Sequence, residues 1–320
     1  MPITPTPPDQ SSFVALSQDL PCVQNSSPHH ELAATSAIGV IGCGVVGEQV
    51  ARDLARVYQT VMVFDTAEEA TVRVITNVVT RNGCVVLAAT NLVSLAKTCH
   101  TVYLALPTPA RHTSEGGGHD VSAIESVLAF LHTFAFRGPV LMRSTLCPGT
   151  TDRLAAVYTA LHLFHIPEFL SSRTAHLDTA LPLQPLILLG VPDGTPAALV
   201  DRVRTLLEAV ACGRQRVATV RAKESEATKL FCNAFYTTKL QLFNEFYQIA
   251  QTEGVSYDMV RHLMLQQGWV HPMHTQVPGP DGQLGVGGAC LPKDAKALAG
   301  HVAASGGASK SPLLRALEQL

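Results

Sequence analysis

An apolar segment that leads directly into a glycine-rich turn is the feature that most restricts how this chain can fold. Ala37–Ile41 is followed by Gly-Cys-Gly-Val-Val-Gly, which has the spacing Gly-x-Gly-x-x-Gly. In a strand–turn–helix unit, the first glycine allows a tight turn, the second lets a phosphate approach the main chain, and the third lets the helix pack on the strand. The helix N-terminus offers unpaired N–H groups to an anion. The pattern predicts a dinucleotide site at Gly42, Gly44, Val45, Val46 and Gly47.

A second apolar segment, Thr60–Phe64, ends at Asp65. An acidic residue in that place suits the ribose hydroxyls of NAD and would repel the 2′-phosphate of NADP. No arginine follows within residues 66–70 to offset the repulsion. A glycine turn alone could form without any ligand, but the two strands and the acid around it favour NAD as the cofactor.

Composition limits the class of protein. The chain has 320 residues, 47% of them hydrophobic and 15% charged, which suits one large or two ordinary globular domains. Its net charge of −2 and lack of a basic run make nucleic acid an unexpected partner. No apolar stretch is long enough to suggest a membrane partner. The eight cysteines are irregularly spaced without a Cys-x-x-Cys pair, so we expect free thiols in a reducing cytoplasm and no zinc site.

Further strand and helix patterns alternate after Asp65. Residues 101–106 and 140–143 are expected strands, and residues 186–189 are expected to form the last one. This alternation predicts a doubly wound parallel sheet, the Rossmann-like architecture, over residues 35–215. Ligands of such sheets gather at the carboxyl ends of the strands. Thr108, Thr145 and Glu168 follow expected strands and would face cofactor and substrate, although each could instead be a turn or capping residue.

The pattern differs at both ends of the chain. Residues 1–34 are rich in Pro, Ser, Thr and Gln, so we expect a disordered tail there and no secretory signal. Residues 216–320 are expected to form a mainly helical domain. Residues 222–252 contain no Gly or Pro and predict one long helix, with shorter helices near 256–264, 294–305 and 313–320. The long helix is apolar almost all the way round, which favours burial in a homodimer.

Two groups in the second domain suggest chemistry. Lys229 and Asn233 are four residues apart, so they share a helix face and could stabilise an oxyanion, or could form an ordinary solvated face. Residues 285–294, with the sequence GVGGACLPKD, gather a thiol, a cation and a potential base within about one helical turn: Cys290, Lys293 and Asp294. We expect Lys293 and the helix N-terminus to favour the Cys290 thiolate. A buried, inert cysteine is the alternative.

These stretches together resemble the UDP-glucose/GDP-mannose dehydrogenases, the nucleotide-sugar 6-dehydrogenases. The resemblance covers about residues 37–300 in the family's order and includes the following stretches: residues 42–47, 106–109, 144–145, 148–151, 167–170, 226–233, 244–245 and 285–294. It implies oxidation of the C6 alcohol of a nucleotide sugar to a carboxylate with two NAD⁺, by a homodimer.

The resemblance also implies roles for individual residues. Cys290 would attack the intermediate aldehyde to give a thiohemiacetal, which is then oxidised to a thioester. Lys229 and Asn233 would hold the C6 oxygen, and Asp294 would act as a base through water. Thr145 and Glu168 would order that water or the substrate. Further cofactor contacts would come from Pro107, Thr108, Ser144, Thr145 and Lys293.

Some features depart from the family pattern. Its members usually continue as a second Rossmann-like domain that grips the nucleotide, so the sequence ending at Leu320 suggests a short form. Ile166, Ser172, Arg173 and Val286 replace residues usual in the family, and residues 268–285 contain His271 and His274 but no arginine. A different sugar, or completion of the site by a partner chain, would fit these changes. The alternatives are a two-electron β-hydroxyacid-type dehydrogenase and a degenerate NAD-binding homologue without activity.

Overall fold

The structure is a computed structural model that describes residues 37–78, 83–111, 117–169, 186–211, 216–306, 312, 313 and 316. The tail predicted over residues 1–34, and most of the helix predicted over 313–320, lie outside the described residues.

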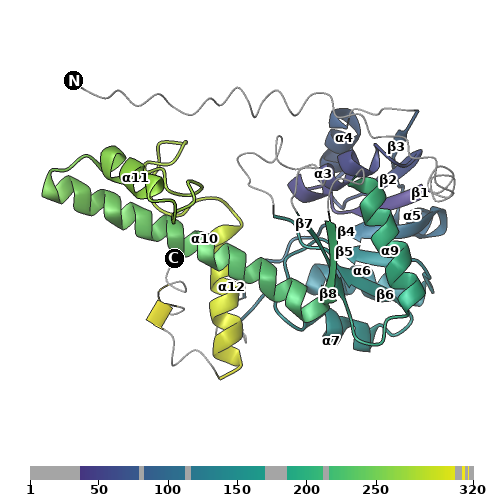
Figure 1. Ribbon diagram of the computed structural model, residues 1–320. Helices are drawn as coiled ribbons and strands as arrows, with labels where there is room; N and C mark the ends of the chain where they lie inside the picture. Colours follow the sequence, from purple (N-terminus) through teal and green to yellow (C-terminus); the bar gives the residue numbers. More distant parts are fainter. Residues whose placement is uncertain are drawn as a thin grey trace.

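A single sheet forms the first part of the molecule (Figure 1). Its eight strands are β1 (Ala37–Ile41), β2 (Thr60–Phe64), β3 (Val85–Ala88), β4 (Cys99–Leu104), β5 (Pro139–Met142), β6 (His162–His165), β7 (Leu186–Val191) and β8 (Arg216–Arg221). They lie in the order β3-β2-β1-β4-β5-β6-β7-β8. Neighbouring strands are parallel except β6 and β7, which are antiparallel. The predicted Rossmann-like doubly wound sheet is confirmed.

The expectation that residues 186–189 form the last strand is wrong, because β8 pairs with β7 along its whole length. Residues 216–221 therefore belong to the sheet and not to the helical part in which the sequence pattern placed them. Their side chains are only half-buried or exposed, so no apolar run marks the strand.

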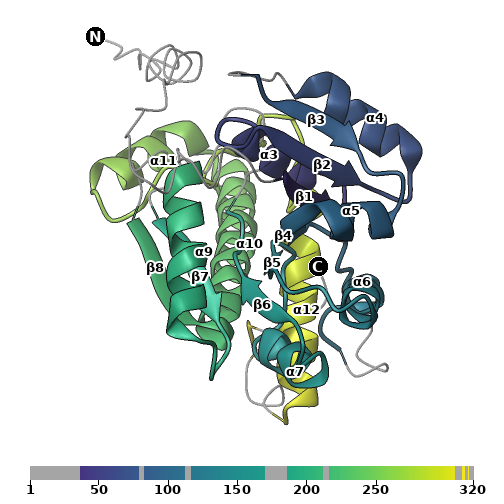
Figure 2. The same cartoon turned by 90° about the vertical axis from the view of Figure 1, so that its right-hand side faces the viewer.

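Helices cover both faces of the sheet (Figure 2). One core contains buried side chains of α3 (Val45–Leu54), α4 (Glu68–Asn77) and α9 (Ala197–Val210). The other contains side chains of α5 (Leu92–Thr98), α6 (Ser122–Thr133) and α7 (Thr150–Val157). Strands β4 and β5 contribute to both cores, because successive side chains point to opposite faces. The sheet is thereby fixed, and its carboxyl edge carries the loops that build the site.

The second part is helical, as the sequence predicts. Helix α10 (Ala222–Glu253) starts directly after β8 and ends at Gly254, which has the left-handed conformation that glycine adopts readily. Figure 1 shows α10 reaching from the sheet out to α11 (Tyr257–Gln266), with α12 (Leu291–Ala304) packed across its middle. Helices α10 and α12 share a small core around Leu230 and Leu298. No helix among the described residues is long and apolar enough to span a bilayer.

Candidate active site

The glycine turn has the geometry that a bound pyrophosphate needs. Gly42 has a φ of +96°, and a Cβ there would lie 2.4 Å from the carbonyl oxygen of Ala105. A Cβ on Gly47 would lie 1.8 Å from the carbonyl oxygen of Gly42, so α3 can pack this closely only with glycine. A Cβ on Gly44 would meet nothing within 4 Å. Gly44 therefore leaves the space through which a phosphate can approach the first turn of α3, where Val45 and Val46 lie.

Asp65 is fixed beside this turn. Its Oδ2 accepts a hydrogen bond of 2.7 Å from the backbone N–H of Cys43, and its Oδ1 accepts one of 2.9 Å from Ala67. The carboxylate thus ties the end of β2 to the glycine turn. It is placed where the ribose of a dinucleotide on this turn would lie.

The loops after β4 and β5 are joined at the same edge. Ser144 Oγ donates to the carbonyl of Leu106 at 2.7 Å and accepts from its N–H at 3.0 Å. Thr108 Oγ1 donates to the carbonyl of Thr145 at 2.9 Å. Both threonines are buried. The hydroxyls of Ser144 and Thr108 therefore hold the loops together, and Pro107 lies between the joined residues.

A buried ion pair connects the end of β6 to α10. Lys229 Nζ lies 3.2 Å from Glu168 Oε1, and their side chains are 3% and 7% exposed. The ring of Phe169 lies 5.3 Å from the same ammonium group. Removing either charge would leave the other buried without its partner, so this pair fixes both side chains. The structure brings together two residues that are 61 positions apart.

The Asp294 carboxylate is held by three side chains. Its Oδ2 accepts a 2.6 Å hydrogen bond from Asn233 Nδ2, and its Oδ1 lies 3.0 Å from His119 Nε2 and accepts from Lys293 Nζ. Burial raises the pKa of Asp294, but the His119 hydrogen bond and the Lys293 charge outweigh it and lower the pKa to about 2. Asp294 is therefore ionised at neutral pH.

Cys290 is the N-cap residue of α12 and is exposed to solvent. The charges of Glu168, Asp294, Lys293 and Lys229 all act on its thiol. Asn233 contacts one of these groups, the Asp294 carboxylate. The expectation of a favoured thiolate is wrong for this state of the protein. Desolvation by the surrounding protein and the charges of Glu168 and Asp294 raise the pKa of Cys290 by more than the two lysines lower it.

The glycine loop before Cys290 is anchored by α10. Asn244 Oδ1 accepts a 2.6 Å hydrogen bond from the N–H of Gly285, whose φ of +85° favours glycine. Val286 is half-buried in this loop, while Ile166 is fully buried in a sheet core. The ring of His274 packs at a tilt of 50° against Tyr236 with ring centroids 4.9 Å apart, and His271 is exposed. Ser172 and Arg173 lie outside the described residues.

Two further residues of the site, His119 and Arg143, are not marked by the sequence motifs. His119 contacts Asp294 and also lies 3.5 Å from Cys147 Sγ through Nδ1. Arg143 is buried and donates from Nη1 to the carbonyls of Ile166 and Pro167, which hold the segment that leads to Glu168. A histidine after a run of glycines, and an arginine inside an apolar strand, are the features that could have drawn attention to them.

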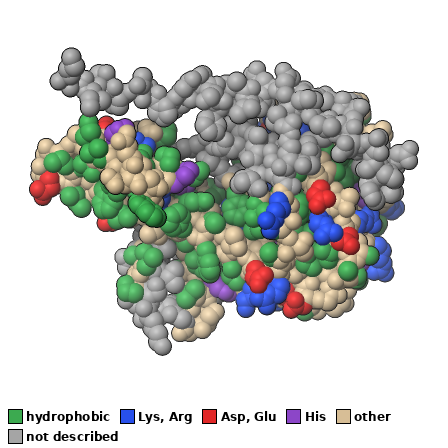
Figure 3. Space-filling view, viewed as in Figure 1, with side chains coloured by type: hydrophobic (Ala, Val, Ile, Leu, Met, Phe, Trp, Pro, Cys, Tyr) green, Lys and Arg blue, Asp and Glu red, His purple; other side chains and the backbone are tan. Residues whose placement is uncertain are grey.

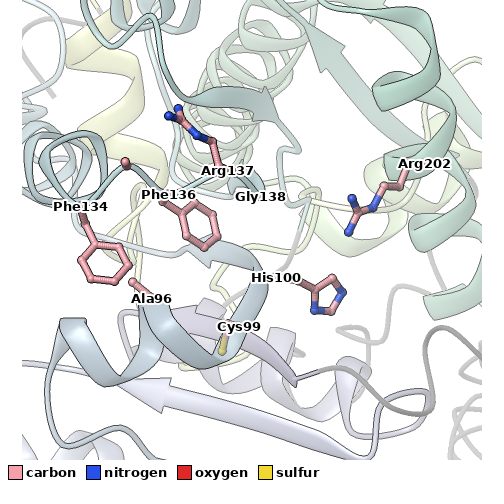
Figure 4. Close-up of a pocket in the computed structure, with 9 residues that line it drawn as sticks. Ala96, Cys99, His100, Phe134, Phe136, Arg137, Gly138 and Arg202 are labelled. Carbon is pink, nitrogen blue, oxygen red and sulfur yellow. The ribbon is translucent and has the colours of Figure 1, made fainter.

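One hollow on the described surface is not part of this site. It encloses about 330 Å³ and is lined by residues at the start of β4, before β5 and on α9, including His100, Arg137 and Arg202 (Figure 4). These are the amino ends of the strands, opposite the glycine turn. Among the described residues, no three His, Cys, Asp or Glu side chains are grouped in a way that could hold a metal ion.

Two family models match the parts just described. Residues 37–118 match the NAD binding domain of 6-phosphogluconate dehydrogenase. Residues 223–320 match the central domain of the UDP-glucose/GDP-mannose dehydrogenase family. The helical part of the chain thus matches the UDP-glucose/GDP-mannose dehydrogenase family, and the sheet part matches a nicotinamide-dinucleotide domain. The resemblance that the sequence motifs indicated is confirmed.

Individual relatives agree with this assignment. The chain is 22% identical to the UDP-glucose 6-dehydrogenase of Streptococcus pneumoniae over 61% of its own length and 49% of the relative. It is 28% identical to the GDP-mannose 6-dehydrogenase of Pseudomonas syringae pv. syringae over 61% of its length and 44% of that protein. The chain thus spans about half the length of these curated relatives.

The solved structures show the fold. A UDP-glucose dehydrogenase from the archaeon Pyrobaculum islandicum superimposes with a TM-score of 0.71 at 21% identity, over 90% of this chain and 68% of that one. The 3-hydroxyisobutyrate dehydrogenase of Mycobacterium tuberculosis superimposes with a TM-score of 0.63 at 17% identity, over 89% of this chain and 91% of that one. The architecture is therefore common to enzymes named for different substrates.

Proposed function

We propose that this protein is an NAD-dependent nucleotide-sugar 6-dehydrogenase that oxidises a C6 alcohol to a carboxylate, as in the conversion of UDP-glucose to UDP-glucuronate. One observation carries the proposal. The charges of the Lys229–Glu168 ion pair and of the Asp294 carboxylate act electrostatically on the exposed thiol of Cys290. Asn233 and Lys293 hold that carboxylate in place. A thiol nucleophile among these groups suits covalent capture of an aldehyde.

The thiol explains how one site can oxidise twice. Addition of Cys290 Sγ to the C6 aldehyde converts a planar carbonyl into a tetrahedral thiohemiacetal, which still has a hydrogen that can leave as hydride. Its oxidation gives a thioester, and water cleaves the C–S bond to release the acid and restore the thiol. The overall change is R–CH₂OH + 2 NAD⁺ + H₂O → R–COO⁻ + 2 NADH + 3 H⁺. NAD⁺ supplies the hydride acceptor for each of the two oxidations.

The surrounding side chains have separate tasks in this scheme. The Lys229 ammonium group and the free N–H of Asn233 would donate to the C6 oxygen while negative charge develops on it. Asp294 would hold and polarise the attacking water, because its lowered pKa keeps it ionised as a hydrogen-bond acceptor. Glu168 holds Lys229. Thr145, buried after β5, would help to order substrate or water.

The glycine turn fits NAD. Gly42, Gly44 and Gly47 would hold the pyrophosphate with the first turn of α3, and Asp65 the adenosine ribose. Pro107, Thr108, Ser144 and Lys293 would line the nicotinamide side. We propose that the protein is a homodimer and works in the cytoplasm, which suits the free thiols among the described cysteines. Titration with NAD⁺ and NADP⁺ tests the choice of cofactor, and equal affinities would exclude it.

Hydride stoichiometry tests the function directly. Nucleotide sugars and free sugar phosphates are screened for NADH formation, and the product is quantified. The proposal requires two NADH per acid formed. The second candidate is a β-hydroxyacid-type dehydrogenase, because the 3-hydroxyisobutyrate dehydrogenase has a similar fold. Such an enzyme would give one NADH per product. An inactive homologue would give none.

Cys290→Ser tests the covalent step. We expect the variant to stop at or after the aldehyde, while NAD⁺ binds with unchanged affinity because the proposed cofactor site is the glycine turn of the other domain. Cys232→Ser, which changes a half-buried cysteine of α10, is the matched control. Full activity of Cys290→Ser would refute the covalent mechanism.

A further inference from the structure

Residues 117–119 of the sheet domain pack on one face of α12. Gly117 has a φ of +62°, and a Cβ there would lie 2.4 Å from the carbonyl of Gly300. A Cβ on Gly300 would lie 2.9 Å from the Cα of Gly117. The two backbones can therefore touch only because both residues are glycine. Asp294, Ala297 and Gly300 recur every three residues along α12, so they form a continuous strip facing this loop.

Among residues 117–119, His119 is the one whose side chain contacts Asp294. It is 1% exposed, and both ring nitrogens have partners: Nε2 lies 3.0 Å from Asp294 Oδ1, and Nδ1 lies 3.5 Å from Cys147 Sγ. Cys147 Sγ also lies 3.9 Å from the carbonyl of Ala297. The loop, the turn before α7 and α12 are thus connected through one imidazole.

The protonation states decide which atom donates in each of the hydrogen bonds that join Cys147, His119 and Asp294. Burial lowers the pKa of His119 and raises the pKa of Cys147 to about 11, so the imidazole and the thiol are both neutral. An ionised Asp294 can only accept, so Nε2 carries the proton and donates it to Oδ1. Nδ1 is then the acceptor for the thiol hydrogen of Cys147. In this tautomer each ring nitrogen of His119 has a partner of the right kind, and Lys293 Nζ also lies 3.5 Å from Nε2.

We propose that His119 is a positioning residue for Asp294. Through Nε2–H it fixes the carboxylate that the proposed dehydrogenase uses to hold water. It thereby fixes the first turn of α12, which carries Cys290 and Lys293, against the dinucleotide domain. The inference rests on the proposed function. His119 does not act as the base itself, because its two nitrogens are occupied and its side chain is buried.

No other contact replaces this one among the described residues. Asn233 donates to Oδ2 from α10, so it fixes Asp294 within the helical part alone. Lys293 donates to the same Oδ1 as His119, but it is the neighbouring residue on α12 and its side chain is 25% exposed. Within the part of the chain that the structure describes, only the His119 hydrogen bond joins Asp294 to the sheet domain, on which the cofactor would lie.

Kinetics of five variants test the role. We expect His119→Ala to lower kcat for NADH formation about 10- to 100-fold while KM for NAD⁺ stays within about twofold, because only the geometry of the reacting groups changes. His119→Gln, which can still donate to Asp294, should recover most of the rate. In the Asp294→Asn background, His119→Ala should add no further loss. His262→Ala, an exposed histidine on α11, is the control.

Additive losses, or a loss expressed only in KM for NAD⁺, would overturn the proposal. A second readout does not need turnover. ¹⁵N NMR should show His119 protonated at Nε2 at neutral pH, and amide exchange in α12 should rise about tenfold or more in His119→Ala and not in His262→Ala. An Nδ1-protonated ring or unchanged exchange would overturn the inference. Absence of NADH from the wild-type protein with these two results intact would refute the proposed function and leave the His119–Asp294 link standing.

Discussion

Exposure distinguishes Cys290 from the other described cysteines. Cys43, Cys84, Cys99 and Cys147 are buried and Cys232 is half-buried. Burial also raises the pKa of the four buried thiols. These four thiols are therefore rarely ionised and are not accessible to a reagent. The pKa of Cys290 is also raised, but Cys290 is accessible. Its reactivity should depend on pH more steeply than a thiol with a lowered pKa would.

We predict that iodoacetamide labels Cys290 ahead of these five residues. The rate should still be rising between pH 8 and pH 9, because the pKa of Cys290 is raised above its ordinary value. NAD⁺ or substrate should slow the reaction. Mass spectrometry of the alkylated peptides measures the order, and Cys290→Ser provides the blank. Faster labelling of a buried cysteine, or a rate already level at pH 7, would contradict the prediction.

His165 should make stability depend on pH. It is fully buried with Nδ1 2.9 Å from Ser225 Oγ, and burial lowers its pKa to about 3. A histidine with a lowered folded pKa contributes stability above its unfolded pKa of about 6.5 and loses it as the pH falls. We predict a loss of about 1.4 kcal/mol per pH unit between about pH 6 and pH 4 from this residue.

His165→Gln isolates that contribution, because the amide can still bond to Ser225 but does not titrate in this range. Urea unfolding at several pH values measures both proteins, and the variant should show a shallower slope. His132→Gln, on the partly exposed end of α6, is the control. Parallel slopes for wild type and His165→Gln would contradict the prediction.

The site was predictable where its residues lie in local motifs and not where long-range contacts define it. Cys290, Lys293 and Asp294 are within five residues, and Lys229 and Asn233 share one helix turn. His119 and Asp294 are 175 residues apart, and nothing in the local sequence marks His119 as the partner of Asp294. The direction of the Cys290 pKa was mispredicted because the largest cause is desolvation in the folded protein, which no local motif shows, and because the charge of the distant Glu168 raises the pKa further.

At the scale of elements, Glu226 of α10 closes the amino end of α7. Its carboxylate accepts from the N–H of Gly149 at 2.5 Å and from both the N–H and the hydroxyl of Thr151, at 2.7 and 2.6 Å. These are groups that a helix leaves unpaired at its start. The helix that carries Lys229 is thus fixed to the sheet domain by a cap from another element.

We predict that Glu226→Ala destabilises the protein by roughly 2–4 kcal/mol, because three buried donors lose their acceptor. Thermal unfolding measures the change. Glu226→Gln should cost less, since its amide oxygen can still accept. Glu208→Ala, at an exposed position of α9, should change stability by less than about 0.5 kcal/mol. An equal effect at both positions would show that the contacts to α7 are not stabilising.

Elements with strong periodic patterns were predictable, and those without were not. The long helix was expected over residues 222–252 and spans Ala222–Glu253. Strand β8 was missed because its side chains are at most half-buried, so the apolar pattern that marks β1 and β4 is absent. The antiparallel placement of β7 against β6 likewise depends on the connection between them, which no local pattern describes.

At the scale of the whole molecule, α10 leaves one apolar face uncovered. Phe231, Phe235, Leu242 and Ile249 are 60%, 61%, 43% and 56% exposed. Their spacings of 4, 11 and 18 residues from the first place them along one side of the helix. Figure 3 shows hydrophobic side chains gathered along α10. A stripe of this length is unusual on the free surface of a monomer and suits burial against a second copy.

We therefore predict that the protein is a dimer at micromolar concentration and that this face lies in the interface. Light scattering should give twice the mass of one chain for the wild type. Phe231→Glu combined with Phe235→Glu should give a monomer, because dimerisation would bury two carboxylates against apolar side chains. Val72→Glu, at a similarly exposed apolar residue on α4, should remain dimeric. A monomeric wild type would refute the prediction, and a dimeric double variant would place the interface elsewhere.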